Sequence, residues 1–379
     1  ARRGERVMRA GADVDTLVIG GGLVGLCVAY GLARAGQRVR VLDEGDIAFR
    51  AARGNFGLVW VQGKGRDRPD YARWTMASAR QWPAFAAELA QRTGVDVCLA
   101  QPGGLTLCLD DGELAERAAG LRRLRDDLGA DYPFEVLNPA EVQALSPHVG
   151  PQVCGAIYSP LDGHVSPLRL LRALVQAFDS LGGELCTDTR VDELTCRDGG
   201  FHVRCGPRWQ AASRLVLAAG LGNRRLAPAV GLRAPVQPNR GQILVTERLQ
   251  PFIRHPTMQV RQTEDGVVQI GDSMEDVGFD DRTSLAQLAR IADRAVRCFP
   301  LLADVNIVRT WGALRVMSPD GFPVYQASTQ CPGAFVVTCH SGVTLAAQHA
   351  SVLADWVRGG HEPPDMAGFK AERFDVQAA

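Results

Sequence analysis

Three glycines near the start of the chain have the types and spacing of a site for phosphates. Gly20, Gly22 and Gly25 form a GxGxxG pattern, and an acidic residue, Asp43, follows about twenty residues later. In this pattern the first glycine permits a tight turn, the second lets a pyrophosphate approach the backbone, and the third packs a helix against a strand. A carboxylate at the later position accepts hydrogen bonds from ribose hydroxyls. The spacing therefore predicts a dinucleotide site.

The segments around these glycines are the ones that such a site needs. The apolar run 16–19 is typical of a buried parallel strand, and residues 26–35 carry apolar side chains at helical spacing. Gly36 ends that helix, and the run 39–42 predicts a second strand that ends at Asp43. A helix that begins at the glycines points unpaired N–H groups at the phosphates. Together these segments predict a Rossmann-like unit.

The glycine pattern alone does not separate FAD from NAD. Its position at the start of the chain favours FAD, and so does a second apolar strand at 215–218. That strand ends in Ala219 and Gly220, small residues that let the backbone approach a cofactor. An ordinary buried strand followed by a turn is the alternative for this second segment. We predict a flavoprotein that binds FAD.

Composition excludes several classes of protein. The 379 residues fit about two domains, and the 42 basic residues equal the 42 acidic ones, which argues against nucleic acid as the main partner. No segment approaches the roughly 18 apolar residues of a membrane helix. The ten cysteines form no CxxC pair or zinc-like spacing, so we predict no metal site and reduced thiols. We expect a cytoplasmic protein, with any membrane association made through partners.

The remaining pattern predicts an α/β (α+β) fold. Helices are expected at residues 71–93, 112–128, 167–181 and 285–299. Strands are expected at 104–109, 155–159, 201–205, 242–246, 267–270, 306–311 and 334–338. The order indicates a Rossmann-like FAD-binding domain interrupted by a discontinuous second domain of mixed antiparallel sheet and helices.

Short motifs spread over the rest of the chain carry a more specific signal. They are DGHVSP at 162–167, LAAG at 217–220, NRGQ at 239–242, IGDSMED at 270–276, TWGALR at 310–315, SPDGFP at 318–323 and HSGVT at 340–344. This set resembles the D-amino acid oxidase-like, or glycine oxidase-like, family of FAD-dependent amine oxidoreductases. The resemblance extends from about Asp15 to Phe369.

The resemblance implies two domains and further subunits. The FAD-binding domain would comprise residues 13–85, 151–235 and 319–379, and the substrate-binding domain residues 86–150 and 236–318. Residues 241–280 and 295–320 look nearest to the flavoprotein (beta) subunits of opine oxidases, D-hydroxyproline dehydrogenase and hydrogen cyanide synthase. Partner subunits are therefore implied, with an iron–sulfur electron carrier as a candidate. This chain has no CxxC-type cluster for such a centre.

The nucleotide motif and the resemblance together imply a set of FAD contacts. We expect them at Gly20, Gly22, Leu23, Val24, Gly25, Asp43, Glu44, Arg50, Asn55, Phe56, Gly57, Leu58, Val191, Ala219, Gly220, Arg315, His340, Ser341, Gly342, Val343 and Thr344.

Arg315 is the predicted anchor of the substrate. The flavin supplies the redox chemistry, so the protein mainly has to hold the substrate Cα–H near flavin N5. A guanidinium holds a carboxylate with two parallel hydrogen bonds and is always charged. The alternative for Arg315 is a surface or ion-paired arginine at a strand end.

Residues 53–64 form the next candidate segment, which by the resemblance runs beneath the flavin ring and out to the pocket. Trp60, Gln62 and Lys64 are predicted to line the pocket or to shape oxygen reactivity, and we select Trp60 and Gln62 as catalytic candidates beside Arg315. The alternative is a glycine-rich connecting loop.

Neither histidine of the motifs is needed as a base, because hydride transfer from a neutral amine requires none. A structural role is the better interpretation of His164. For His340, contact with the flavin and a structural role both stay open.

The resemblance implies oxidation of an amino acid, imino acid, opine or related secondary amine to an imine. Two other functions stay open: a flavin-dependent 2-hydroxy acid dehydrogenase, and a non-catalytic FAD-carrying subunit of an electron-transfer complex. The WGALR element favours catalysis. Ser166 stands in place of an acid in DGHVSP, and the His340 loop lacks the arginine found in the family. The substrate range of glycine oxidase is therefore not carried over.

Overall fold

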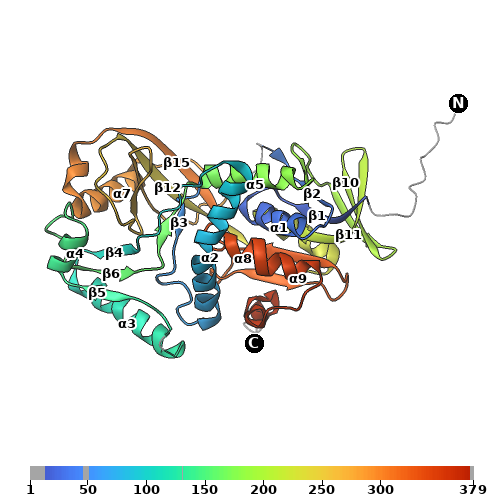
Figure 1. Cartoon of the computed structure of the whole chain (residues 1–379), viewed down its shortest axis with the longest axis horizontal. Helices are drawn as coiled ribbons and strands as arrows, with labels where there is room; N and C mark the ends of the chain where they lie inside the picture. Colours follow the sequence, from blue (N-terminus) through green and yellow to red (C-terminus); the bar gives the residue numbers. More distant parts are fainter. Residues whose placement is uncertain (1–12, 46–50, 130, 376–379) are drawn as a thin grey trace.

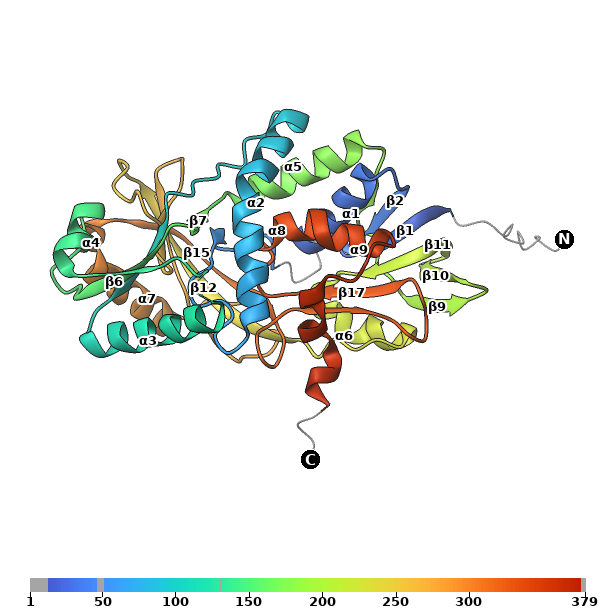
Figure 2. The same cartoon turned by 60° about the horizontal axis from the view of Figure 1, so that its bottom comes forward.

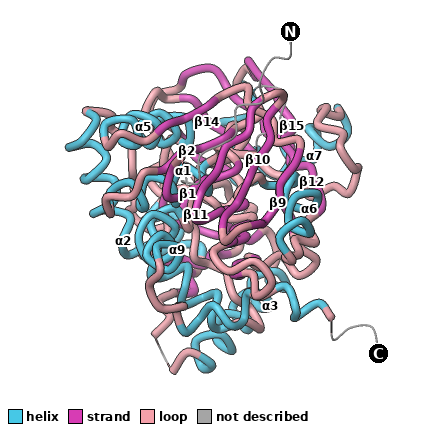
Figure 3. Tube along the Cα trace, turned by 90° about the vertical axis from the view of Figure 1, so that its right-hand side faces the viewer, coloured by secondary structure: helices cyan, strands magenta, loops and turns pink. Residues whose placement is uncertain are grey.

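The predicted nucleotide-binding unit lies at the centre of the largest sheet. The computed structural model describes residues 13–45, 51–129 and 131–375. Strand β1 (Val14–Ile19) pairs in parallel with β2 (Val39–Leu42) and with β11 (Arg208–Leu217) (Figure 3). Leu17 and Val18 of β1 are fully buried. A parallel sheet covered on both faces explains why these strands are continuous apolar runs.

Five more strands complete this eight-stranded sheet. The order is β16-β17-β11-β1-β2-β8, and β10 and β9 form an antiparallel extension from β11. These strands are β16 (Val324–Ala327), β17 (Ala334–Thr338), β8 (Glu184–Cys186), β10 (Gly200–Cys205) and β9 (Glu193–Arg197). β17 pairs in parallel with β11, so the carboxyl ends of β1, β11 and β17 meet at one edge.

Helices cover the faces of the sheet. Helix α1 (Leu23–Arg34) contacts α5 (Pro167–Ser180) and the C-terminal helical segment (Figure 2). That segment consists of α8 (Ala346–Gln348), a π-helical turn (His349–Leu353) and α9 (Ala354–Arg358). The other face carries α6 (Asn223–Leu226), between 3-10 turns at Gly220–Gly222 and Ala227–Val230. Two more 3-10 turns, Pro364–Phe369 and Ala371–Phe374, follow α9.

The other half of the molecule contains two antiparallel sheets (Figure 1). The larger has the order β13-β14-β12-β15, with β13 (Val260–Gln262), β14 (Val267–Ile270), β12 (Gln237–Arg248) and β15 (Ile307–Met317). The smaller has the order β4-β6-β5, with β4 (Gly104–Cys108), β6 (Gly155–Ser159) and β5 (Glu135–Leu137). Around them lie α3 (Asp111–Asp127), α4 (Pro139–Leu145), α7 (Leu285–Cys298) and a 3-10 turn (Pro300–Asp304).

Two elements connect the halves. Helix α2 (Pro69–Thr93) runs between them, and β3 (Leu58–Val59) pairs with β7 (Gly163–His164) (Figure 1). The predicted α/β (α+β) architecture is confirmed by these sheets and helices. The division into two domains at the stated boundaries stays a proposal. β6 pairs with β4 and β5, although the boundary at residue 151 would place it with the larger sheet.

One predicted strand is longer than expected, and the difference affects the site. The strand predicted at 306–311 extends to Met317, because β15 pairs with β12 along almost its whole length. Arg315 therefore lies inside a paired strand, opposite Asn239. A strand interior fixes the direction of a side chain more firmly than a loop does.

Candidate active site

The turn between β1 and α1 is built as the glycine pattern predicts. Gly20 has φ +111°, and a Cβ there would lie 2.4 Å from the Ala218 carbonyl oxygen. A Cβ on Gly25 would lie 1.9 Å from the Gly20 oxygen, so helix and strand can approach only without a side chain. At Gly22 a Cβ would meet nothing within 4 Å. The space beside Gly22 is thus open on the side where α1 begins.

The first turn of α1 supplies unpaired donors. No side chain caps the helix at Gly22, and the first N–H groups of a helix have no partner inside it. Nearby, the Asp43 carboxylate accepts hydrogen bonds from Gly21 N at 2.7 Å and Gly45 N at 2.9 Å. These contacts fix the carboxylate at the carboxyl end of β2. The arrangement attracts phosphate at the helix and hydroxyls at the acid.

A cavity of about 160 Å3 adjoins this turn. We call it the nucleotide cavity. The residues predicted to contact FAD that line it are Gly20, Gly22, Leu23, Val24, Asp43, Glu44, Asn55, Val191, Ala219, Gly220, His340 and Gly342. The Thr338 side chain also lines it, and its buried Oγ1 has no hydrogen-bond partner among the described residues. An open helix start and an unpaired buried hydroxyl fit a polar cofactor such as FAD.

A second cavity of about 520 Å3 lies next to the first, and we call it the substrate cavity. Ala51, Asn55, Val316, Cys339 and His340 line both, so the two are continuous. The other predicted residues that line the substrate cavity are Phe56, Leu58, Trp60, Gln62, Arg315, Ser341, Val343 and Thr344. The combined space suits a molecule that reaches from the β1–α1 turn to Arg315.

Two of the predicted FAD contacts in the described ranges line neither cavity. Gly25 packs α1 against β1, which agrees with the packing role expected of the third glycine. Gly57 has φ +89°, and a Cβ there would lie 2.5 Å from the Val165 oxygen, so this glycine also serves close packing. Arg50 lies outside the described residues.

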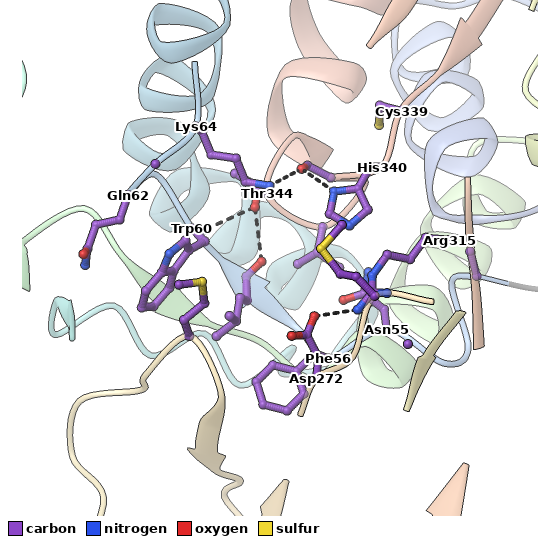
Figure 4. A pocket seen from close by; sticks show the side chains of 18 of the residues that line it. Asn55, Phe56, Trp60, Gln62, Lys64, Asp272, Arg315, Cys339, His340 and Thr344 are labelled. Atoms are coloured by element: carbon purple, nitrogen blue, oxygen red, sulfur yellow. Dashed lines mark hydrogen bonds and ion pairs between the residues drawn. The ribbon is translucent and has the colours of Figure 1, made fainter. Parts of the chain in front are cut away.

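Arg315 faces the substrate cavity but already holds a carboxylate. Its Nη2 lies 2.5 Å from Asp272 Oδ2, and its Nη1 donates to the Ser273 carbonyl at 2.7 Å and to Asn239 Oδ1 at 3.2 Å (Figure 4). The Arg315 side chain is 17% exposed, whereas that of Asp272 is 44% exposed. Arg315 therefore lines the cavity, as the predicted substrate anchor should, and is also ion-paired, as in the alternative interpretation. A ligand carboxylate has to displace Asp272 or share the guanidinium with it.

Gln62 and Trp60, the other catalytic candidates, differ in whether their polar side-chain atoms have hydrogen-bond partners. Gln62 donates to the Gly104 oxygen at 3.0 Å and accepts from Thr106 Oγ1 at 2.9 Å, so both ends of its amide contact β4. Trp60 is buried, and its indole Nε1 has no hydrogen-bond partner among the described residues. The Trp60 indole nitrogen is therefore buried and unpaired, whereas Gln62 chiefly holds the wall in place.

Lys64 lines the substrate cavity, although it was not among the selected catalytic residues. Its Nζ donates to Ser341 Oγ at 2.6 Å (Figure 4). The Tyr71 hydroxyl donates to the same oxygen at 2.9 Å. Desolvation lowers the pKa of Lys64 to about 8. A sequence signal existed: Lys64 and Lys370 are the only lysines of the chain, and the other basic residues are arginines.

The two histidines occupy different environments. Burial lowers the pKa of His340 well below its ordinary value, and the charges of Lys64 and Arg315 lower it further. His340 is therefore neutral at physiological pH. His164 lines neither cavity and pairs with the buried Arg261, whose Nη1 lies 3.0 Å from His164 Nδ1. Desolvation lowers the His164 pKa to about 3, which agrees with a structural role.

Three further features bear on the class of protein. In the ranges that the structure describes, no group of three or more His, Cys, Asp or Glu side chains could hold a metal ion. All ten cysteines are free thiols. None of the helices in the described part of the chain combines the length and apolar character needed to cross a bilayer.

Comparisons with known proteins agree with this geometry. Residues 15–356 match the family described as FAD dependent oxidoreductase. The chain is 43% identical to the B subunit of opine oxidase from Agrobacterium tumefaciens (strain Ach5) and 42% identical to that from Rhizobium meliloti, in both cases over 97% of this chain and 99% of the relative. The crystal structure of glycine oxidase from Geobacillus kaustophilus superposes with a TM-score of 0.86 at 26% identity, over 94% of this chain and 98% of that one. This chain is an enzyme that belongs to the family of FAD-dependent oxidoreductases.

Proposed function

We propose that the protein oxidises an amino acid, an imino acid or a related secondary amine, of the D-proline, hydroxy-D-proline or opine type. The observation that carries the proposal is Arg315, whose guanidinium faces a cavity continuous with the nucleotide cavity. FAD held in the nucleotide cavity, at Gly22 and Asp43, would supply the hydride acceptor for the oxidation of the substrate to an imine. All other requirements of the reaction fall on the residues of this chain.

Arg315 orients the substrate through its carboxylate. Asn239 and the Ser273 carbonyl hold one arm of the guanidinium, while the more exposed Asp272 occupies the other. A substrate carboxylate that replaces Asp272 forms charge-assisted hydrogen bonds in the same place. The strand position of Arg315 then fixes the Cα relative to the cofactor, and such positioning accounts for much of the rate in this kind of reaction.

The surrounding charges favour the reactive form of the amine. Hydride leaves a neutral amine more readily than an ammonium ion, because nitrogen must donate its lone pair. Lys64 and Arg315 both act on the cavity with positive charge, as their effect on the His340 pKa shows. The same field lowers the pKa of a bound amine. Neutral His340 adds no charge of its own to this effect, and the amine proton leaves to water without a dedicated base.

Relatives support both the substrate type and the existence of partners. The opine oxidase relative is named as one subunit of an enzyme, and so is hydrogen cyanide synthase subunit HcnC of Pseudomonas aeruginosa, which is 27% identical over 96% of this chain. We propose that this chain also works with partner subunits, with an iron–sulfur carrier as the candidate electron acceptor.

Flavin reduction without oxygen tests the proposal directly. The purified protein is mixed with D-proline, cis-4-hydroxy-D-proline, an opine or a 2-hydroxy acid, and the yellow flavin absorbance is followed. We expect an amine to bleach the flavin, and Arg315→Ala to slow bleaching by about 100-fold or more while FAD stays bound. Arg309→Ala is the matched control, because Arg309 lies on the same strand but stacks over Trp311 and does not line the cavity.

The other outcomes select between the remaining functions. Bleaching by a 2-hydroxy acid alone would replace the amine substrate with a hydroxy acid. A flavin that none of these compounds reduces, even with the partner subunits present, would point to an FAD-carrying subunit without catalysis of its own. Admission of oxygen after bleaching then separates an oxidase from a dehydrogenase.

A further inference from the structure

The basic residues that line the substrate cavity differ in whether they have a carboxylate partner. Four basic residues line it: Lys64, Arg66, Arg117 and Arg315. Each arginine has a carboxylate partner, at 3.9 Å for Arg66 and Glu116, 3.0 Å for Arg117 and Glu113, and 2.5 Å for Arg315 and Asp272. Within the described ranges, Lys64 has no carboxylate at ion-pair distance, and its hydrogen bond goes to the Ser341 hydroxyl.

The surroundings of Lys64 supply no negative charge in direct contact with it. Desolvation raises the pKa of Cys339 to about 12, and it raises that of Tyr71 far above neutrality, so both groups are neutral. The Asp162 carboxyl accepts at Oδ1 from Val61 N at 2.5 Å, and its charge acts on Lys64 only from beyond ion-pair distance. Asp272 is held by Arg315, and the neighbouring His340 is neutral.

The Lys64 ammonium group is held by one hydrogen bond and has further N–H groups that can donate to a ligand. Ser341 Oγ accepts from Lys64 and from the Tyr71 hydroxyl, so the lysine head is fixed from the side of α2. An ammonium group has three N–H donors, and Ser341 uses one of them. In Figure 4, Lys64 and Arg315 lie on opposite sides of His340, and both side chains reach toward the space between them.

We propose that Lys64 binds a second carboxylate of the substrate, which makes the cavity selective for amines that carry two carboxylates. This inference rests on the proposed function, in which Arg315 holds the first carboxylate. A partly buried cation with no carboxylate at ion-pair distance gains from an anionic ligand, which supplies a charge-assisted hydrogen bond in place of water. Two cations on opposite sides of one cavity match a dicarboxylate better than a single carboxylate.

The choice of lysine also fits this role. Apart from Lys64 and Lys370, the chain uses arginine for every basic position. An arginine in place of Lys64 would offer a planar fork, whereas the ammonium is a compact point charge on a flexible stem. Such a charge can follow the free end of a substrate after the amine and its first carboxylate are fixed.

Binding of unreactive acids tests Lys64 without relying on the amine chemistry. Glutarate carries two carboxylates and no amine, and pentanoate has the same chain length with a methyl group in place of one carboxylate. Each is titrated into the FAD-loaded protein, and the dissociation constant is read from the flavin absorbance change or from thermal stabilisation. We expect glutarate to bind at least about tenfold tighter than pentanoate, the worth of one charged hydrogen bond. Lys64→Met should remove this preference and Lys64→Arg should retain part of it.

Chemical labelling gives an independent readout. Amine acetylation followed by peptide mass spectrometry reports on Lys64 and Lys370, the two lysines of the chain. Glutarate should slow modification of Lys64 several-fold and leave Lys370 unchanged, because Lys370 is paired with Glu362 in the C-terminal region. Pentanoate should protect Lys64 less.

Three outcomes would overturn the proposal. An unchanged glutarate preference in Lys64→Met means that another group holds the second carboxylate. An equal loss for glutarate and pentanoate means that Lys64 and Arg315 share one carboxylate. A changed FAD affinity or flavin reduction potential with unchanged acid binding assigns Lys64 to the cofactor. The glutarate preference can be lost in Lys64→Met while no amine reduces the flavin. That result would support Lys64 as a carboxylate anchor and contradict the proposed amine oxidation.

Discussion

The nucleotide cavity and the substrate cavity are adjacent, but they are built by different means. The nucleotide cavity lies at the carboxyl ends of β1, β2 and β11, and among the residues that line it are the glycines Gly20, Gly22, Gly220, Gly222 and Gly342. The substrate cavity is formed by side chains from α3, β12, β15 and the segment after β3, and four of them are basic. The nucleotide cavity therefore depends on close approach of a ligand to the backbone at its glycines. The substrate cavity depends on how its basic side chains divide their interactions between protein carboxylates and a ligand.

The largest expected effect breaks the nucleotide cavity. Gly25→Val places side-chain atoms where a Cβ would already lie 1.9 Å from the Gly20 oxygen. We expect loss of bound FAD and a large loss of stability, in the range of severe backbone clashes of about 4 kcal/mol or more. The FAD-to-protein absorbance ratio and thermal unfolding measure both effects.

Gly22→Ala is the matched comparison for Gly25→Val. A Cβ at Gly22 meets no protein atom within 4 Å, so the protein without FAD should keep its unfolding temperature. FAD affinity should nevertheless fall, because the added methyl group occupies the space where the pyrophosphate approaches the backbone. A Gly22→Ala protein with unchanged FAD affinity would mean that the cofactor does not approach α1 at this point.

A smaller effect is expected from a change of pH on the affinity of the substrate cavity for glutarate. The Lys64 pKa is lowered to about 8, so the ammonium that attracts an anion is lost as the pH rises through that value. Glutarate affinity should fall by several-fold between about pH 7.5 and 9.5, although bound glutarate itself raises the lysine pKa and shifts the fall upward. The acid stays fully ionised across this range.

Lys64→Arg is the control for this pH effect, because arginine stays charged throughout. The fall above about pH 8 should flatten in that variant. Desolvation raises the pKa of the buried Asp162 to about 7, so we expect its ionisation to account for any change that remains near pH 7. An equally steep fall in Lys64→Arg and in the unchanged protein would contradict the assignment to Lys64.

The smallest effect is expected at Gln62. Gln62→Leu removes both amide contacts to β4 and leaves Thr106 Oγ1 and the Gly104 oxygen without this partner. The free energy of unfolding should fall by about 1–3 kcal/mol, the usual cost of unpaired buried groups. The rate of flavin reduction should change by less than about tenfold. A loss as large as that of Arg315→Ala would restore Gln62 as a catalytic residue.

The sequence by itself determined the nucleotide-binding unit. The strand at 16–19, the three glycines, the helix that ends before Gly36 and the acid at Asp43 all appear in the structure as predicted. These features depend on local backbone geometry: a tight turn, an uncapped helix start and close packing constrain the residues that form them. The motif at 310–315 likewise indicated which arginine faces the cavity.

Only the tertiary structure decided how the charged and polar groups are used. Asp272, in the segment after β14, pairs with Arg315 of β15, and β4 contacts both ends of the Gln62 amide. Ser341 holds Lys64 from a loop 277 positions away. No spacing in the sequence predicts these contacts. The strength of a charge depends on its neighbours and its exposure to water, and folding sets both.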